Sequence, residues 1–188
     1  MRGDRDTSGA RDGSDLDLRG FVREVPDFPR PGILFRDITP LLLDAGALDA
    51  AVAALGEQAA PLGVQFVVAA EARGFILGGA LACRLRAGFV PARKPGKLPH
   101  TTISAQYALE YGLDSLEVHA DALAGGARVL VHDDLLATGG TARALCDLVM
   151  GLGGDVVGCT FLVELNGLGG RGRLAPHHVY SLIEYDGA

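Results

Sequence analysis

The sequence lacks any uninterrupted apolar run that approaches the roughly 18 residues needed by a membrane-spanning helix. Residues 1–20 are polar and charged and hold no apolar stretch of the signal-peptide type. We therefore expect a cytoplasmic protein that has no membrane partner.

Cysteine pairs and an excess of positive charge are also missing. Cys83, Cys146 and Cys159 are widely spaced and form no CxxC pair, which argues against a disulfide framework or a zinc site and favours small core residues. The formal net charge of −6 argues against a protein that binds nucleic acid through a broad basic face. A small anionic ligand stays open, because phosphate sites are built locally from backbone amides and a few cations.

Apolar residues are present in the amount that one domain requires. The chain has 188 residues, 48% of them apolar, which is enough for a single hydrophobic core. Residues 1–14 lack apolar side chains that could pack, so we expect a disordered N-terminal extension and a single domain over 15–188. Ser14 and Asp15 are candidate caps for a short amphipathic helix over 16–25, which the prolines from Pro26 onwards end.

Helix-like and strand-like segments alternate along the rest of the chain. Helices are expected over 48–60, 74–86 and 140–152, and short apolar strands over 64–70, 88–92 and 129–132. Strand-like alternation surrounds a turn at 110–114 within residues 101–119, and the segments 155–163 and 179–185 complete the series. This order predicts an α/β fold with a central, mostly parallel sheet flanked by helices. Because ligands bind beyond the carboxyl ends of such strands, the loops after Ala70, Ala92 and His132 are the candidate binding loops.

The most specific segment runs from Val129 to Thr141 and reads VLVHDDLLATGGT. A short strand ends in two acids, Asp133 and Asp134, and a small, glycine-bearing turn then leads into a helix. Free N–H groups at the start of that helix attract a phosphate, together with the helix dipole, and glycine lets the backbone approach it closely. The two carboxylates can accept hydrogen bonds from the vicinal hydroxyls of a sugar. The segment predicts a site for ribose 5-phosphate, and an ordinary acidic strand-to-helix turn is the alternative.

This segment resembles the phosphoribosyl pyrophosphate signature of type I phosphoribosyltransferases. The resemblance implies the fold of that family, with a small N-terminal hood formed mainly by 15–40 and a flexible catalytic loop. It also implies a site for the ribose and the 5′-phosphate composed of Asp133, Asp134, Ala137, Thr138, Gly139, Gly140 and Thr141. His132 departs from the family pattern, which usually has an aliphatic residue before the acid pair. It is either a satisfied core histidine or a group that tunes the neighbouring carboxylates.

A second resemblance concerns residues 28–40, which read FPRPGILFRDITP. Taken alone, this stretch is a rigid loop with a charged pair, typical of a packed surface turn. It is similar to the base-binding segment of the adenine-specific members of the family, in which an aromatic ring stacks on the purine. The resemblance implies an adenine site formed by Leu34, Phe35, Arg36 and, from the segment VELN, Leu165.

The loop after the strand that ends at Ala70 places an arginine at a helix start. Taken alone, the sequence EARGF is a helix N-terminus with an exposed Arg73. The resemblance implies instead that Glu71, Ala72 and Arg73 bind pyrophosphate, that Arg73 takes part in catalysis, and that the peptide bond between Glu71 and Ala72 is cis.

The loop over 93–99 contains Lys94 and Lys97, the only lysines in the chain. A charge run of this kind is usually a solvated face. The loop resembles the RKxGKLP loop of the family, which implies that Arg93, Lys94 and Lys97 bind pyrophosphate. It also implies a homodimer, in which the loop reaches the active site of the neighbouring subunit.

Residues 101–112, TTISAQYALEYG, place Glu110 and Tyr111 near the expected turn. On spacing alone, Glu110 is an exposed carboxylate on a hairpin. The segment resembles the flexible catalytic loop of the adenine-specific enzymes. The resemblance implies that Glu110 donates to, or orients, the imidazole edge of the purine. Tyr111 would help to close a lid that excludes water.

The resemblances cover roughly residues 16–185 and together imply one activity. The 5-phosphoribosyl group of phosphoribosyl pyrophosphate would pass to adenine, giving AMP and pyrophosphate. Mg²⁺ would act as the cofactor, bound mainly through the substrate phosphates and ribose, with no direct protein ligand. One alternative is an enzyme for hypoxanthine, guanine or xanthine. The other is a non-catalytic regulator that senses phosphoribosyl pyrophosphate, which would need a DNA-binding element that the short N-terminal tail cannot form.

Overall fold

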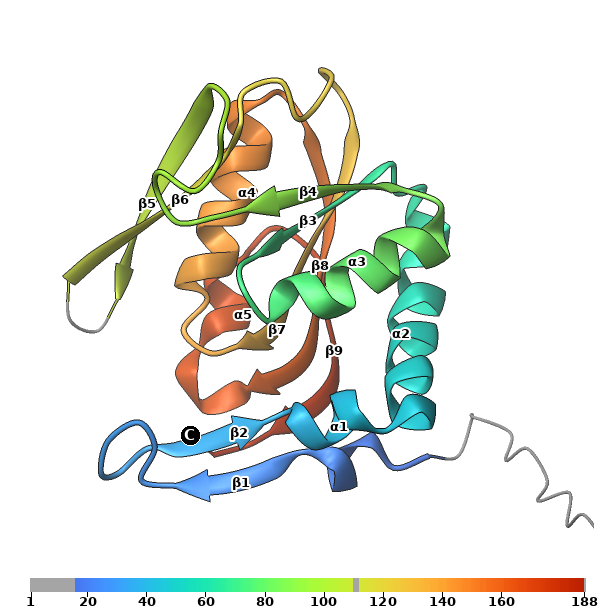
Figure 1. Cartoon of the computed structure of the whole chain (residues 1–188), viewed down its shortest axis with the longest axis vertical. Coiled ribbons are helices and arrows are strands. Elements are labelled where there is room, and N and C mark those ends of the chain that lie inside the picture. The colour runs from blue at the N-terminus through green and yellow to red at the C-terminus, as the bar shows by residue number, and fades with distance from the viewer. Residues whose placement is uncertain (1–15, 110–111, 188) are drawn as a thin grey trace, which may run out of the picture.

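The computed structural model describes residues 16–109 and 112–187, and its centre is a five-stranded sheet (Figure 1). The order across the sheet is β4-β3-β7-β8-β9, and each neighbouring pair is parallel. The strands are β3 (Phe66–Ala70), β4 (Gly88–Ala92), β7 (Arg128–Leu136), β8 (Asp155–Leu165) and β9 (Val179–Tyr185). The predicted α/β fold with a mostly parallel central sheet is confirmed.

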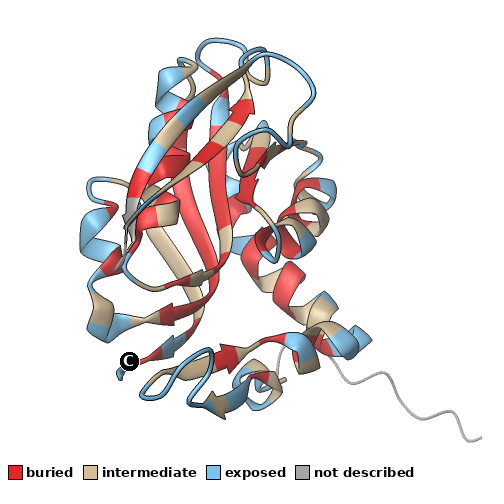
Figure 2. Cartoon of the chain, turned by 60° about the vertical axis from the view of Figure 1, so that its left-hand side comes forward, coloured by how far each residue is buried: buried red, intermediate tan, exposed pale blue. Residues whose placement is uncertain are grey.

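Helices cover both faces of the sheet, because its strands turn apolar side chains alternately to two sides. Val68 and Val131 belong to the core cluster that includes α4, whereas Val67 and Leu130 pack with α2 and α3. Figure 2 shows the buried strands between these layers. The helices are α1 (Thr39–Leu43), α2 (Ala45–Ala59), α3 (Gly74–Leu85), α4 (Gly140–Gly151) and α5 (Gly170–Arg173). Short 3₁₀ turns occur at η2 (Leu18–Phe21), η3 (Ala60–Leu62) and η4 (Asn166–Leu168).

A small antiparallel hairpin of β1 (Arg23–Pro26) and β2 (Leu34–Asp37) lies beyond the carboxyl ends of β7, β8 and β9 (Figure 1). Val22 and Ile38, which flank the hairpin, pack in one cluster with Ile183 and Tyr185 of β9. The N-terminal segment is therefore fixed at the edge of the sheet where ligands bind in such folds.

The predicted amphipathic helix over 16–25 is wrong. Only Leu18–Phe21 is helical, as a single 3₁₀ turn capped by Asp17, and the chain becomes strand β1 at Arg23. The spacing of apolar residues in so short a segment does not separate helix from strand, and pairing with β2 decided the outcome. The sequence prediction also missed α1, which begins beside Pro40, a residue tolerated in the first turn of a helix.

A second antiparallel hairpin, β5 (Thr102–Leu109) and β6 (Gly112–His119), projects from the domain and packs its buried face on α4 (Figure 1). The predicted strand-like alternation over 101–119 is confirmed. The turn is shorter than expected, because Gly112–Asp114 already pair with Tyr107–Leu109. In the described part of the chain, no helix has the length and apolar character needed to span a bilayer.

Candidate active site

A cavity of about 290 Å³ opens at the carboxyl ends of β3 and β7. It brings together the loop after β3, the loop after β4, the second half of β7 and the hairpin β5–β6. The described residues that line it are Ala70, Glu71, Ala72, Arg73, Lys94, Tyr107, Leu116, Asp133, Asp134 and Thr141. The sequence predicted binding loops after Ala70, Ala92 and His132. The first two contribute to this pocket, together with the acid pair that follows His132.

The acid pair lies within β7 rather than at its end, so this boundary prediction is wrong. β7 continues to Leu136, because Leu135 and Leu136 still pair with β8. On its other edge β7 pairs with β3 only as far as His132. The free edge of β7 beyond His132 is the wall of the cavity, and Asp133 and Asp134 lie on it.

The two carboxylates are in an environment that opposes a double negative charge. Burial, followed by the charge of Asp134, raises the pKa of Asp133 well above its ordinary value. Burial also raises the pKa of Asp134, while the Arg73 guanidinium acts in the opposite direction. Arg73 Nε lies 2.7 Å from Asp134 Oδ2, but among the described residues that oxygen has no aligned hydrogen-bond donor. The pair is therefore ready to accept hydrogen bonds from hydroxyl groups of a ligand.

Helix α3 approaches the acid pair closely because it begins with a glycine. A Cβ atom on Gly74 would lie 2.7 Å from Asp133 Oδ1, closer than real Cβ contacts allow. The position of the Asp133 carboxylate thus depends on the missing side chain at 74. The preceding peptide bond between Glu71 and Ala72 is cis, as the resemblance implied.

The segment 137–141 forms the turn between β7 and α4. Gly139 has a φ of +77° and is the N-cap of α4, where no described side chain caps the first turn. The helix therefore begins with N–H groups available to an anion, supported by the dipole of a 12-residue helix. Thr141 lines the cavity, and Thr138, three residues earlier in the chain, is exposed. This arrangement fits a phosphate at the helix start.

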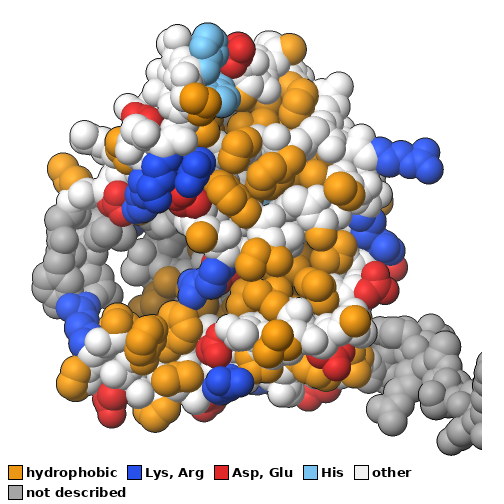
Figure 3. Space-filling model, in the orientation of Figure 1, with side chains coloured by type: hydrophobic (Ala, Val, Ile, Leu, Met, Phe, Trp, Pro, Cys, Tyr) orange, Lys and Arg blue, Asp and Glu red, His pale blue; other side chains and the backbone are white. Residues whose placement is uncertain are grey.

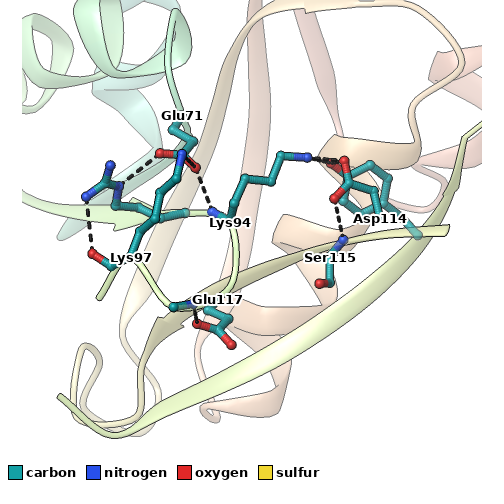
Figure 4. A network of polar contacts seen from close by, with 9 residues as sticks. Glu71, Lys94, Lys97, Asp114, Ser115 and Glu117 are labelled. Carbon is teal, nitrogen blue, oxygen red and sulfur yellow. Dashed lines mark hydrogen bonds and ion pairs between the residues drawn. The ribbon is translucent and has the colours of Figure 1, made fainter. Parts of the chain in front are cut away.

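Glu71 organises the basic loop that follows β4 (Figure 4). Its carboxylate accepts hydrogen bonds from Arg93 Nε at 2.9 Å, the Lys94 amide at 2.8 Å and Lys97 Nζ at 2.9 Å. Burial acts to raise the pKa of Glu71, but these hydrogen bonds together outweigh burial and lower the pKa to about 2. An ionised carboxylate repels pyrophosphate, so the geometry supports an indirect role for Glu71, which is to hold the cations of the loop. Figure 3 shows Lys and Arg side chains gathered beside acidic ones in this region.

Lys94 extends across the cavity to the hairpin β5–β6. Its ammonium group forms an ion pair with Asp114 and lies 3.2 Å from the Tyr107 hydroxyl (Figure 4). Burial acts to lower the pKa of Lys94, but the hydrogen bonds to Asp114 and Tyr107 and the charges of these two groups together outweigh it and raise the pKa. The sequence prediction missed Tyr107, Asp114 and Leu116, because only the folded hairpin brings the first two to Lys94 and Leu116 into the cavity lining.

The predicted base-binding residues lie in the N-terminal hairpin and at the end of β8. The Arg73 guanidinium carbon is 5.2 Å from the centroid of the Phe35 ring, so one arginine contacts both this ring and Asp134. Arg36 is buried, pairs with Glu24 and stacks 3.9 Å from the centroid of the Tyr185 ring. The described lining of the cavity contains none of the predicted adenine-binding residues Leu34, Phe35, Arg36 and Leu165. Glu110 and Tyr111, predicted to be catalytic, lie outside the described residues.

His132 is a buried core residue on the face of the sheet that carries α3. Its Nδ1 atom lies 3.2 Å from Thr160 Oγ1, whereas Nε2 has no partner among the described residues. Burial lowers the pKa of His132 to about 4, so the ring is neutral near neutral pH. A neutral ring adds no positive charge beside the carboxylates, and the geometry favours the core interpretation, with one nitrogen satisfied.

Glu71→Gln is expected to lower the free energy of unfolding near neutral pH, because the amide has no charge to pair with Arg93 and Lys97. The pKa of Glu71 falls from 4.5 to about 2 on folding, so its charge stabilises the fold fully above 4.5. That contribution is lost as the pH falls from 4.5 towards 2. The stability difference between wild type and variant, measured by urea denaturation, should therefore shrink over this range.

The matched control is Glu57→Gln, since the Glu57 side chain is 76% exposed on α2 and lies 3.9 Å from Arg84. Its effect on the free energy of unfolding should be small and nearly independent of pH. An equally flat pH dependence for Glu71→Gln would contradict the role assigned to this carboxylate.

Comparison with known proteins agrees with the chemistry of this pocket. Residues 44–185 match the family model of the phosphoribosyl transferase domain. An adenine phosphoribosyltransferase from Rubrobacter xylanophilus is 60% identical over 169 residues, which cover 89% of this chain and 91% of that protein. One from Symbiobacterium thermophilum is 56% identical over 170 residues, which cover 90% of this chain and all of that protein.

Solved structures show the same fold. The crystal structure of adenine phosphoribosyltransferase from Thermoanaerobacter pseudethanolicus superposes with a TM-score of 0.87 at 50% identity, covering 89% of this chain and 98% of that one. The Saccharomyces cerevisiae enzyme, complexed with an imino-altritol bisphosphate and adenine, superposes with a TM-score of 0.84 at 36% identity. The match covers 87% of this chain and 95% of that one. The chain belongs to the phosphoribosyltransferase family, among its adenine phosphoribosyltransferases.

Proposed function

We propose that this protein transfers the 5-phosphoribosyl group of phosphoribosyl pyrophosphate to adenine, giving AMP and pyrophosphate. The observation that carries the proposal is the single pocket that joins an acid pair on β7, the uncapped start of α4 and the cations Arg73 and Lys94. These parts match the three chemical regions of the donor, which are vicinal hydroxyls, a terminal phosphate and a pyrophosphate. Relatives that are 60% and 56% identical to this chain are named adenine phosphoribosyltransferases.

In this proposal the acid pair and the turn at 137–141 hold the sugar phosphate. Asp133 and Asp134 accept hydrogen bonds from the ribose hydroxyls, and each bond to a charged group contributes about 1.5–3 kcal/mol. Hydroxyl donors also offset the loss of solvation on burial that raises the pKa of both carboxylates. The amides at the start of α4, with the hydroxyls of Thr138 and Thr141, bind the 5′-phosphate.

The leaving pyrophosphate is stabilised by cations on the loops after β3 and β4. Arg73 lies on the cavity and exchanges its contact with Asp134 for the phosphate oxygens. Lys94 lies in the pocket of its own chain. Arg93 and Lys97 are partly exposed although Glu71 holds them, with side-chain exposures of 36% and 50%. We therefore propose a homodimer in which these two cations of the loop 93–99 reach the neighbouring active site.

Adenine binds between the N-terminal hairpin and the end of β8. Phe35 stacks on the purine, Leu34 supplies backbone hydrogen bonds, and Leu165 forms the opposite apolar wall. Arg36 lines this region from strand β2. It pairs with Glu24 of β1 and stacks on the ring of Tyr185 of β9. Arg73 contacts both Phe35 and Asp134, which supports a base site next to the sugar site. Adenine occupies the related Saccharomyces cerevisiae enzyme in its crystal structure, which supports this ligand.

The residues present fit a Mg²⁺ ion that arrives with the substrate. Among the described residues, no three His, Cys, Asp or Glu side chains gather as a metal site. The cavity does offer the paired carboxylates Asp133 and Asp134, whose oxygen atoms can accept hydrogen bonds from water molecules on a Mg²⁺ ion that the substrate holds. An ion bound there would neutralise charge on the pyrophosphate, while the protein orients the sugar and the leaving group.

The hairpin β5–β6 carries the proposed lid. Its described strands end at Leu109 and begin again at Gly112, and the proposed lid residues Glu110 and Tyr111 are the two that lie between these positions in the sequence. We assign to Glu110 the proton donation to, or orientation of, the purine imidazole edge, and to Tyr111 the closure of the site. Exclusion of water matters because a ribosyl cation-like transition state is otherwise open to hydrolysis.

Purified protein incubated with Mg²⁺, phosphoribosyl pyrophosphate and one purine at a time should form AMP from adenine and little nucleotide from hypoxanthine, guanine or xanthine. Nucleotide release is followed by chromatography. Faster turnover of another purine would assign the protein to that base. Binding of phosphoribosyl pyrophosphate without turnover of any base would favour the regulator.

Glu110→Gln is expected to lower kcat by about 10²–10⁴, because removing a general acid removes a contribution of this size. The KM values for both substrates should change little. Glu57→Gln, on the exposed surface of α2, is the control and should retain wild-type kcat. A Glu110→Gln variant with unchanged kcat would remove this residue from the chemistry.

Gly74→Ala should raise the KM for phosphoribosyl pyrophosphate about tenfold, which corresponds to the loss of one hydrogen bond of about 1.4 kcal/mol. The added methyl group displaces the Asp133 carboxylate, whose Oδ1 atom lies 2.7 Å from the Cβ position. Gly79→Ala is the control in the same helix, since no described heavy atom lies within 4 Å of its Cβ position. Equal kinetics for the two variants would show that the Asp133 position does not limit substrate binding.

A further inference from the structure

The outer side of the 137–139 turn rests on a second glycine, Gly170, with no side chain between the two backbones. A Cβ atom on Gly170 would lie 2.3 Å from the carbonyl oxygen of Ala137 and 2.9 Å from Leu136 Cδ1. In the reverse direction, a Cβ on Gly139 would lie 2.8 Å from the carbonyl oxygen of Gly170. These distances are too short for a side chain on either residue, so glycine is required on both sides of the contact. Gly139 also has a positive φ, which independently favours glycine.

The turn that carries Gly170 is itself fixed to the sheet by the next residue, Arg171. The Arg171 guanidinium donates to both carboxylate oxygens of Glu164 on β8, and Nη1 donates to the Val179 carbonyl at 2.8 Å. Glu164 is 2% exposed and also accepts from Ser181 Oγ at 2.6 Å. Charge-assisted, bidentate pairs of this kind hold their partners in a defined geometry. The contact surface at Gly170 is therefore held by β8 and β9.

We propose that Gly170 is a positioning residue for the 5′-phosphate site, with Arg171 as its anchor. The inference rests on the proposed function and adds to it a support outside the pocket. Because Gly170 contacts the backbone at Ala137 and Gly139, it sets where the following amides of the α4 N-terminus lie. Real Cβ atoms are essentially never found within 3.0 Å of such a heavy atom, so a methyl group at 170 must move the Ala137 carbonyl. The phosphate ligands in residues 138–141 then move with it.

Gly170→Ala and Gly172→Ala form a matched pair on the same short helix. Gly172 is exposed, and no described heavy atom lies within 4 Å of its Cβ position. Gly170→Ala should raise the KM for phosphoribosyl pyrophosphate by about tenfold to a hundredfold, since small misplacements of binding groups have effects of this size. The KM for adenine should stay within about twofold of wild type. Affinity for ribose 5-phosphate, measured by calorimetry, should fall in parallel, and Gly172→Ala should match wild type in each measurement.

A double variant separates movement of the turn from a disturbed core. Gly170→Ala also contacts the Leu136 side chain, and Leu136→Ala removes that contact while leaving the Ala137 carbonyl in place. The double variant should keep the raised KM for phosphoribosyl pyrophosphate and the reduced affinity for ribose 5-phosphate, relative to Leu136→Ala alone. The same comparison decides the question if Gly170→Ala alone does not fold.

Three results would overturn the positioning role. These are wild-type affinity for ribose 5-phosphate in Gly170→Ala, recovery of that affinity in the double variant, or equal losses for adenine and phosphoribosyl pyrophosphate. In each of them wild-type protein still forms AMP, so the proposed function stands. A wild-type protein that forms no AMP and binds no ribose 5-phosphate would overturn both proposals.

Discussion

Two neighbouring carboxylates on one buried strand, with one guanidinium among the described residues in contact, set the conditions for the rest of the site. Asp133 and Asp134 lie on the free edge of β7, where burial and mutual repulsion raise the pKa of Asp133. Arg73 contacts Asp134 at 2.7 Å, and its charge acts to lower the pKa of both carboxylates without cancelling the effect of burial. Such a pair is stabilised by a ligand that brings hydroxyl donors and a metal ion, and a phosphorylated sugar with Mg²⁺ has both.

Close backbone contacts surround this acid pair and define its geometry. Gly74 lets the first turn of α3 approach Asp133, and Gly139 and Gly170 let the turn after β7 rest on the segment after β8. A side chain at any of these positions would displace a carboxylate or a carbonyl group. Because hydrogen bonds form only over a narrow range of distances, such a displacement weakens them. The sheet thus locates the acid pair and the start of α4 through close contacts at glycines, while Glu71 holds the cations of the loop 93–99.

The parts of the site that could be predicted from the sequence are those whose residues are adjacent along the chain. The acid pair, the turn at 137–141 and the strands around them are recognisable because their residues follow one another along the chain. The end of β7 was misplaced, because charged residues inside a buried strand are rare and the free edge is visible only in the sheet. Asp114 and Tyr107 were missed because their contact with Lys94 depends on hairpin register. The role of Glu71 as an organiser of cations likewise required three-dimensional distances.

A crystal structure with AMP bound tests the central claim most directly. The account predicts the 5′-phosphate within hydrogen-bond distance of backbone amides in residues 138–141, and the ribose hydroxyls on Asp133 and Asp134. A well-ordered AMP whose phosphate lay elsewhere, with the acid pair still facing Arg73 alone, would contradict it.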